Sequence, residues 1–304
     1  MVLPTPFERL LQDTVQLANR DPGAAFARLD DLYGKSLSEQ DVLQLGSFAV
    51  HLGATSLGRW QETAAFQHRL LAHPSLIPDS PIARSLWRGL AVVERGAGRH
   101  DEATEAIRNG VHSRADECRL AVMSAQTLTV RGRAQEGIAH LRQAALLCGD
   151  LDPKDEIIMQ VATVAANLMR MAEPQVKLAQ ELLIASAFAH STALSRAGDW
   201  RLTHRAWFQQ GLAYCLAAKP TQALHCVQLM MEFEDHHNAG PAERYMTAAL
   251  ACRAQAVRGQ FKIAAGALEA CQDFAKRVDL PEMAKQIQGS LTDLEAFLAS
   301  AQQN

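Results

Sequence analysis

The stretch GLAYCLAAKPTQAL, residues 211–224, contains the end of one predicted helix and the start of the next. Alanine and leucine, which favour helices, make up much of it on both sides of the joint at Lys219-Pro220. Proline cannot continue a helix but fits well in a first turn, so we expect the second helix to begin there. Gly211 and Ala223 lie on either side of the joint and are small. The stretch therefore predicts a helical hairpin whose two helices pack closely.

The same punctuation recurs along the chain. Predicted helix starts pair a turn or capping residue with proline, since proline tolerates the first helical position. They are Thr5-Pro6, Asp21-Pro22, Ser80-Pro81, Asp152-Pro153, Glu173-Pro174 and Gly240-Pro241. Predicted helix ends carry a glycine that suits left-handed backbone, namely Gly58, Gly98, Gly132 and Gly259. These signals divide the chain into about fifteen helices, and because alternating strand patterns are absent, the predicted fold class is all-α.

A repeat emerges when the joints are aligned. A small residue recurs a few positions into every second helix, at intervals of about 40 residues. These residues are Ala25, Ala64, Ala103, Gly137, Ala179, Ala223 and Ala264. An apolar residue recurs on the preceding helix, at Phe48, Trp87, Ala121, Trp207 and Ala248. Each pair marks one helical hairpin.

Two of these hairpins match part of the motif W-x2-L-G-x2-Y followed by A-x3-F, and in this they resemble the tetratricopeptide repeat family, although Glu94 replaces the tyrosine in one and Gln210 the leucine in the other. The matching residues are Trp87, Leu90, Ala91 and Ala103 in one hairpin and Trp207, Gly211, Tyr214 and Ala223 in the other. The resemblance implies a right-handed superhelical solenoid of stacked antiparallel hairpins, in a single domain over residues 1–304. Residues 281–301 are then a C-terminal capping helix. Whether the stacking stays regular in residues 149–200, where the repeat is weakest, is left open.

Composition excludes several classes of function. The formal net charge of −3 gives no overall attraction to nucleic acid. No apolar stretch is long enough to span a membrane, so membrane insertion is not expected. The six cysteines form no CxxC pair, which favours reduced core thiols and a cytoplasmic location.

Candidate chemistry is sparse. The run Glu232–His237 resembles a metal cluster, but adjacent helical histidines point about 100° apart, so we expect no metal there and a solvated helix end instead. Cys215 and Cys226 lack a local histidine and carboxylate arrangement for nucleophilic catalysis. No phosphate-binding or dinucleotide motif follows a strand. The sequence therefore predicts no catalytic residue, cofactor or metal, and a protein that is not an enzyme.

The resemblance implies that the exposed side of the first helix of each hairpin lines a concave groove for a partner segment. Arginine suits carboxylates because its planar fork donates two parallel hydrogen bonds. The residues expected in this groove are Arg88, Arg95, Arg119, Gln126, Arg205, Gln209 and Arg253. The expected partner is another protein or peptide, acidic in character, bound by a scaffold, chaperone or regulatory adaptor. A sensory domain that changes curvature on binding a peptide or small ligand, and a helical-repeat enzyme, are the alternatives, and the oligomeric state is left open.

Overall fold

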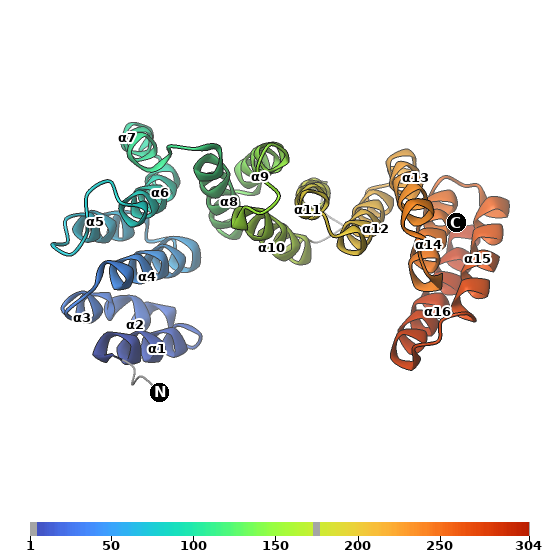
Figure 1. Cartoon of the computed structure of the whole chain (residues 1–304), viewed down its shortest axis with the longest axis horizontal. Coiled ribbons are helices and arrows are strands. Elements are labelled where there is room, and N and C mark those ends of the chain that lie inside the picture. Colours follow the sequence, from blue (N-terminus) through green and yellow to red (C-terminus); the bar gives the residue numbers. More distant parts are fainter. Residues whose placement is uncertain (1–4, 173–176, 304) are drawn as a thin grey trace. The chain divides into compact units, whose positions relative to one another are not determined.

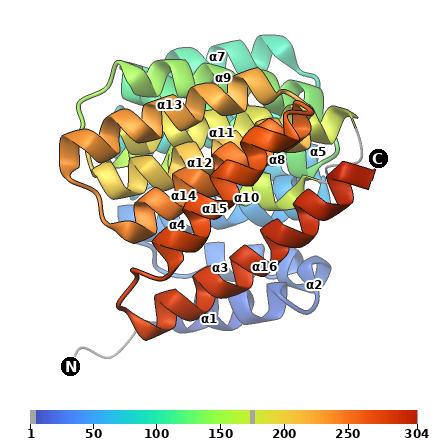
Figure 2. The same ribbon diagram turned by 90° about the vertical axis from the view of Figure 1, so that its right-hand side faces the viewer.

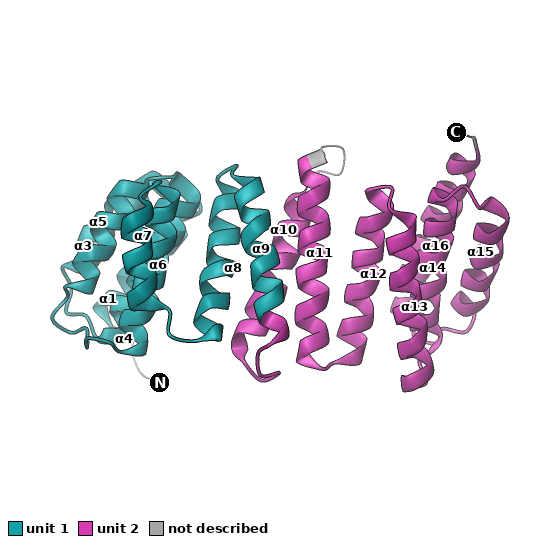
Figure 3. Cartoon of the chain, turned by 90° about the horizontal axis from the view of Figure 1, so that it is seen from above, with its two compact units in different colours: residues 1–147 teal, residues 148–304 magenta. Residues whose placement is uncertain are grey.

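The computed structural model describes residues 5–172 and 177–303, and its contacts group the chain into two compact units, residues 1–147 and residues 148–304 (Figures 1 and 3). The units are described separately below. The described residues are helical throughout, with turns between the helices and no β-strand. The predicted all-α class is confirmed, whereas the handedness of the superhelix and the single domain over residues 1–304 stay predictions.

The first unit is built from helices of 5 to 17 residues. They are α1 (Pro6–Ala18), α2 (Pro22–Ala27), α3 (Leu29–Tyr33), α4 (Glu39–Ala49), the π-helix η1 (Val50–Leu57), α5 (Trp60–Leu71), α6 (Pro81–Gly96), α7 (His100–Gly110), α8 (Arg114–Val130) and α9 (Ala134–Gly149). The π-helix continues α4 directly, so α4 and η1 form one rod. The boundary between the units falls near the end of α9.

The second unit contains longer helices. They are α10 (Glu156–Met171), α11 (Lys177–Ala197), α12 (Trp200–Leu216), α13 (Pro220–His237), α14 (Pro241–Val257), α15 (Phe261–Ala275) and α16 (Pro281–Gln303). The predicted start at Asp152-Pro153 is early, because Asp155 caps α10 instead. The predicted start at Glu173-Pro174 lies outside the described residues.

Neighbouring helices pack in pairs, as the small-residue repeat predicts. The pairs α6 with α7, α10 with α11, α12 with α13 and α14 with α15 share extensive contacts. Some first helices of successive pairs also contact each other: α4 with α6 and α6 with α8 in the first unit, and α12 with α14 in the second. The second helices α11 and α13 instead contact each other little, although both pack on α12.

The joints between paired helices use left-handed backbone where the sequence predicts it. Gly58, Gly98, Gly132 and Gly259 have φ between +70° and +79°. Glycine adopts this conformation without the steric cost that a side chain imposes. The joint after α12 is an exception, since Ala218 takes the same position with φ of +53°.

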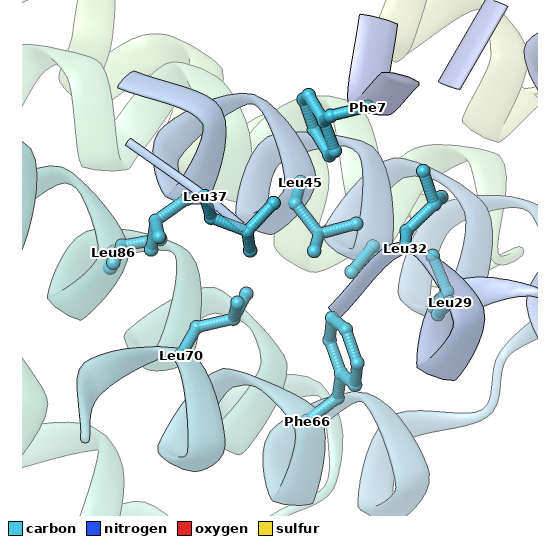
Figure 4. Packing of buried hydrophobic residues seen from close by; sticks show 10 residues of the cluster. Phe7, Leu29, Leu32, Leu37, Leu45, Phe66, Leu70 and Leu86 are labelled. Carbon is cyan, nitrogen blue, oxygen red and sulfur yellow. The ribbon is translucent and has the colours of Figure 1, made fainter. Parts of the chain in front are cut away.

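The core of the first unit forms where α1, α3, α4, α5 and α6 meet (Figure 4). Its fully enclosed side chains include Leu32, Leu45 and Leu70. Phe7 follows the Thr5-Pro6 start, where Thr5 and Glu8 form a capping box, and it packs into this core. Burying a leucine side chain of this kind contributes about 1.5–3 kcal/mol.

The last helix, α16, lies against α14 and α15 (Figure 2). Its buried face carries Ile287, Leu291, Leu294 and Leu298. The polar residues on its other side are exposed, namely Glu282, Lys285, Gln286, Gln288 and Asp293. The helix extends to Gln303, two residues past the predicted end.

The small residues of the repeat motif are more deeply buried than the large ones. The small or aliphatic members Leu90, Ala91, Ala103, Gly211 and Ala223 are buried, while Trp87, Trp207 and Tyr214 are only partly buried. A Cβ atom on Gly211 would stand 2.3 Å from a methyl carbon of Leu250 on α14. The absence of a side chain therefore lets α12 approach the first helix of the next hairpin, which is the close approach expected of this glycine.

A buried polar network joins three helices of the second unit. His204 on α12 is fully buried, and its Nε2 lies 3.0 Å from Oε1 of Glu234 on α13. The hydroxyl of Thr247 on α14 donates to the same carboxylate oxygen and lies 3.2 Å from the histidine. The prediction that residues 232–235 form a solvated face is therefore wrong for Glu234, which is 7% exposed.

Candidate functional site

Arg88 does not face an open groove, so the expectation for this residue is wrong. Its side chain is buried, and its Nη1 donates to Oδ1 of Asp116 at 2.7 Å and to the carbonyl oxygen of Gly110 at 2.8 Å. Burial lowers the pKa of the Arg88 guanidinium, and the neighbouring carboxylate opposes this effect. Through these two hydrogen bonds, Arg88 links α6 to α7 and to α8.

Asp116 also forms an ion pair with Arg119, a second arginine that the sequence placed in the groove. Arg119 lies 3.6 Å from its Oδ1, and both arginines line one cavity with this carboxylate. Burial acts to raise the pKa of Asp116, but the Ser113 hydroxyl, Arg88 and the backbone N–H of His112 outweigh it and hold the pKa below its usual value. The structure therefore brings Arg88 and Arg119 together around an acidic residue that the sequence reasoning did not consider.

Arg95 and Gln126 also lie in the first unit. Nη1 of Arg95 lies 3.2 Å from Nε2 of His140 and 3.4 Å from the hydroxyl of Ser124. Burial, followed by the charge of Arg95, lowers the pKa of His140. Gln126 is partly buried at the edge of a different cavity, on the side formed by α4, η1, α6 and α8.

The remaining predicted residues lie in the second unit. Arg205 and Gln209 are exposed on α12, and Arg205 lines a cavity toward α14 and α16. The guanidinium carbon of Arg253 lies 4.9 Å from the centre of the Phe297 ring, where a cation and a π-face attract each other. These residues are more accessible than Arg88, but each has a different environment.

A large cavity lies in the second unit, where it is lined by α11, α12 and α13. Its volume is about 750 Å³, within the range of about 300–1,000 Å³ that is typical of ligand sites. The separation of α11 from α13 opens this space, since both helices pack on α12 but hardly on each other. Its apolar lining comes from Phe188 on α11, Trp207 on α12 and Leu229 on α13. We call this cavity the α12 pocket.

The repeat-motif aromatics Trp207 and Tyr214 line this pocket and also pack against the core of the second unit. Trp207 packs edge-on against Phe233, with ring centres 4.5 Å apart, and its indole also lines the cavity. Tyr214 lies on the same face of α12, and its hydroxyl accepts a hydrogen bond from Nε2 of Gln210 at 3.2 Å. The Oε1 of Gln210 in turn accepts from the hydroxyl of Ser191 at 2.6 Å. The Ser191 hydroxyl also lies 2.9 Å from the carbonyl oxygen of Phe188, so its single proton is shared between two acceptors.

The α12 pocket contains a cationic side chain and no carboxylate. Arg196 on α11 and His225 on α13 line it, and among the described residues no aspartate or glutamate does. Nε of Arg196 donates to the carbonyl oxygen of Leu151 at 2.6 Å, which holds the guanidinium in place. A pocket with apolar walls and a fixed cation is suited to an apolar group that lies beside an anion.

Catalytic chemistry finds little support in the same pocket. Burial raises the pKa of Cys226, which lines it, to about 11, and that of Cys215 to about 12. Thiols with such pKa values are protonated near neutral pH and are poor nucleophiles. Among the described residues no group of three or more His, Cys, Asp or Glu side chains could hold a metal ion.

Sequence reasoning identified the aromatic motif but missed the residues opposite it. Phe188, Ser191 and Arg196 lie on α11, where the repeat is weakest, so no motif marks them. His225 is one of several isolated helical histidines, and nothing in the sequence distinguishes it. A helix-face projection of α11 could have shown that Phe188, Ser191 and Ser195 are spaced by three and four positions and so share a face.

Comparison with known protein families finds no family that matches the chain, and comparison with curated proteins finds no match either. Among the described residues no helix has the length and apolar character needed to cross a bilayer.

Proposed function

We propose that this protein is a non-enzymatic binding module, and that the α12 pocket receives a segment of a partner protein. The observation that carries the proposal is the pocket itself, in which apolar walls from three helices surround a fixed arginine and no acidic side chain. The right-handed tetratricopeptide-like stack and the cytoplasmic location expected from the sequence belong to the same proposal.

The chemistry of the lining defines the segment. An aromatic or large aliphatic side chain fits against Phe188 and Trp207, because aromatic surfaces supply much of the energy of such contacts. A carboxylate beside it, from an acidic side chain or a chain terminus, can accept hydrogen bonds from Arg196 and from the Tyr214 hydroxyl. The partner is therefore acidic, as the sequence predicts, but the proposed site lies between the second helices α11 and α13 instead of along the first helices.

Selection from a peptide library tests this proposal with a defined probe. A display library of random peptides, with both internal and free C-terminal segments, is selected on the full chain. Affinities of synthetic peptides are then measured by fluorescence anisotropy. We expect enriched peptides to carry an aromatic or large aliphatic residue next to a carboxylate.

Three variants locate the binding. Ser195 lines the pocket and is exposed, so Ser195→Trp fills the pocket without disturbing the core. We expect Ser195→Trp to weaken binding of the selected peptides about tenfold or more, because the indole occupies the pocket. We expect Arg196→Gln to weaken binding by a similar factor, since a hydrogen bond to a charged group contributes about 1.5–3 kcal/mol. Arg201→Gln is the matched control, because Arg201 is exposed on α12 and does not line the pocket. Peptides that bind the two pocket variants as tightly as the wild type would refute the proposal.

A further inference from the structure

A second site in the first unit centres on the amide of Gln67. This side chain on α5 is fully buried, and its Nε2 donates to the carbonyl oxygen of Gly46 on α4 at 2.7 Å. Its Oε1 is also buried and has no hydrogen-bond partner among the described residues. A flip of the amide would leave the Gly46 carbonyl facing an oxygen, so the orientation is fixed. A buried acceptor without a donor costs about 1–3 kcal/mol, which a bound donor would recover.

Gly89 leaves space near this oxygen, since a Cβ atom placed there would stand 4.0 Å from Oε1 of Gln67. At Gly46 the corresponding space is filled by Leu86, whose methyl carbon lies 2.2 Å from the Cβ position. Gln67 itself lines a cavity of about 160 Å³ between α4, η1, α6 and α8. A side chain at position 89 would narrow this cavity beside the unpartnered acceptor.

The π-helix η1 forms one wall of this cavity. His51 and Thr55 of η1 line it, and the Thr55 hydroxyl lies 3.1 Å from that of Thr127 on α8. The wider turn of a π-helix disturbs the regular α-helical hydrogen bonds, and π-helical segments occur frequently at functional sites. The hydroxyl of Ser56 accordingly donates to the carbonyl oxygen of His51, five residues earlier, at 3.1 Å.

The lining is mainly apolar, with Val50, Leu86 and Met123 contributing to it, and it includes His51 at its exposed edge. Its polar part comes from the hydroxyl groups of Ser47, Ser85, Thr55 and Thr127 and from the amide of Gln126, and among the described residues no Asp, Glu, Lys or Arg lines it. An ion would lose its hydration there without a counter-charge, so the lining selects a neutral ligand. That ligand needs a donor for Oε1 of Gln67 and an acceptor for the surrounding hydroxyl and amide donors.

We propose that this cavity, the Gln67 pocket, binds a primary carboxamide. The carboxamide NH₂ group donates to Oε1 of Gln67, and its carbonyl oxygen accepts from the hydroxyl or amide groups of the wall. The carboxamide comes either from an asparagine or glutamine side chain of a partner segment or from a small free amide. The Gln67 pocket and the α12 pocket lie in different units and share no residue, so each proposal can fail alone.

Ligand-observed saturation-transfer NMR on the full chain tests the proposal with three probes. Propionamide carries the carboxamide, propionate replaces it with a charged group of the same shape, and N-acetylasparagine methylamide presents it on a peptide unit. We expect propionamide to bind at least tenfold more tightly than propionate. A further tenfold gain for the asparagine probe identifies a partner segment as the source, and equal affinity identifies a free amide.

Two variants assign the signal to this pocket. Gly89→Ala places a methyl group beside Oε1 and 3.3 Å from a Val50 methyl carbon, which can shift, so the variant is expected to fold. Gln126→Leu removes the amide at the edge of the pocket while keeping its size. Gly266→Ala is the matched control, because nothing lies within 4 Å of its added carbon. We expect at least fivefold weaker binding of propionamide to the first two variants and an unchanged affinity in the control.

Several results would overturn the proposal. Equal binding of propionamide and propionate would show that the site does not select a neutral amide. Undiminished binding in Gly89→Ala and Gln126→Leu would place the signal elsewhere. A crystal structure soaked in propionamide that shows only an ordered water on Oε1 of Gln67 would identify a structural water site instead.

Discussion

Replacing Ala218 by glycine should stabilise the protein. Ala218 follows α12 with φ of +53°, whereas the corresponding joints after η1, α6, α8 and α14 use glycine. The hydrogen bonds at the joint are the same in kind. The N–H of Lys219 donates to the carbonyl oxygen of Tyr214 at 2.8 Å, as the N–H of Arg99 donates to that of Glu94 at 2.9 Å. The substitution therefore changes the backbone energy of one residue and leaves the cap intact.

The expected gain follows from two opposing effects. Left-handed backbone costs an L-residue other than glycine about 1–2 kcal/mol, and Ala218→Gly removes that cost. Glycine in turn makes the unfolded chain more flexible, which opposes folding by about 0.4–1 kcal/mol. Ala218 is exposed, so its methyl group contributes little packing. The net increase in the free energy of unfolding is about 0.5–1 kcal/mol.

Urea denaturation followed by circular dichroism measures this difference, with Ala217→Gly as the matched control. Ala217 precedes Ala218 and has φ of −90°, so glycine relieves no strain there and should destabilise the protein by about 0.5–1 kcal/mol. Opposite signs for the two variants are the expected result. A lower free energy of unfolding for Ala218→Gly, equal to that of the control, would refute the assignment of strain to this joint.

Three further predictions concern other parts of the chain. Interactions hold the pKa of Asp116 below its usual value, so its stabilising effect should be present above about pH 4 and lost as the pH falls through the lowered pKa. The free energies of unfolding of the wild type and of Asp116→Asn should therefore converge as the pH is lowered. A difference between them that is independent of pH would contradict this. The raised pKa values of Cys215 and Cys226 should make their alkylation by iodoacetamide at pH 8 at least tenfold slower in the native than in the unfolded chain, and equal rates would contradict it. Gly211→Ala should lower the free energy of unfolding by about 1–3 kcal/mol, because the added methyl group clashes with α14. Gly266→Ala, whose added carbon meets nothing within 4 Å, should raise it by about 0.5–1 kcal/mol. Equal urea midpoints for the two variants would show that the close approach at Gly211 is absent.

The fold was largely predictable because its signals are local. Proline starts and glycine ends depend on the backbone of one or two residues, so Ser80-Pro81 and Gly98 mark their boundaries without knowledge of the rest of the chain. The small residues Ala103 and Ala223 report helix contact for the same reason, since a hairpin packs against itself. The prediction at Asp152-Pro153 was early because a proline turn there precedes the capping residue Asp155.

The sites were less predictable because they depend on contacts between distant residues. Arg88 has the spacing of a groove residue, but Asp116 lies 28 positions later and buries it, which no local pattern reveals. Trp207 matches a packing motif, yet the separation of α11 from α13 leaves its ring on the wall of a pocket. Gln67 lacks any motif, and only the helices around it make its amide unusual. Burial and pairing of polar side chains are properties of the assembled helices.

The His204, Glu234 and Thr247 network bears on how the second unit unfolds. In a stack of helical hairpins, stability is the sum of what each hairpin contributes alone and what its interface with the next one contributes. Because this network joins both helices of one hairpin to α14 of the next, opening either hairpin exposes a buried carboxylate and imidazole that lose their partners. Such a cost raises the interface contribution, so fraying of the α14 and α15 hairpin is coupled to loss of the α12 and α13 hairpin. The residues that line the α12 pocket on α12 and α13 thus gain protection from local opening through side chains that never contact the pocket's occupant.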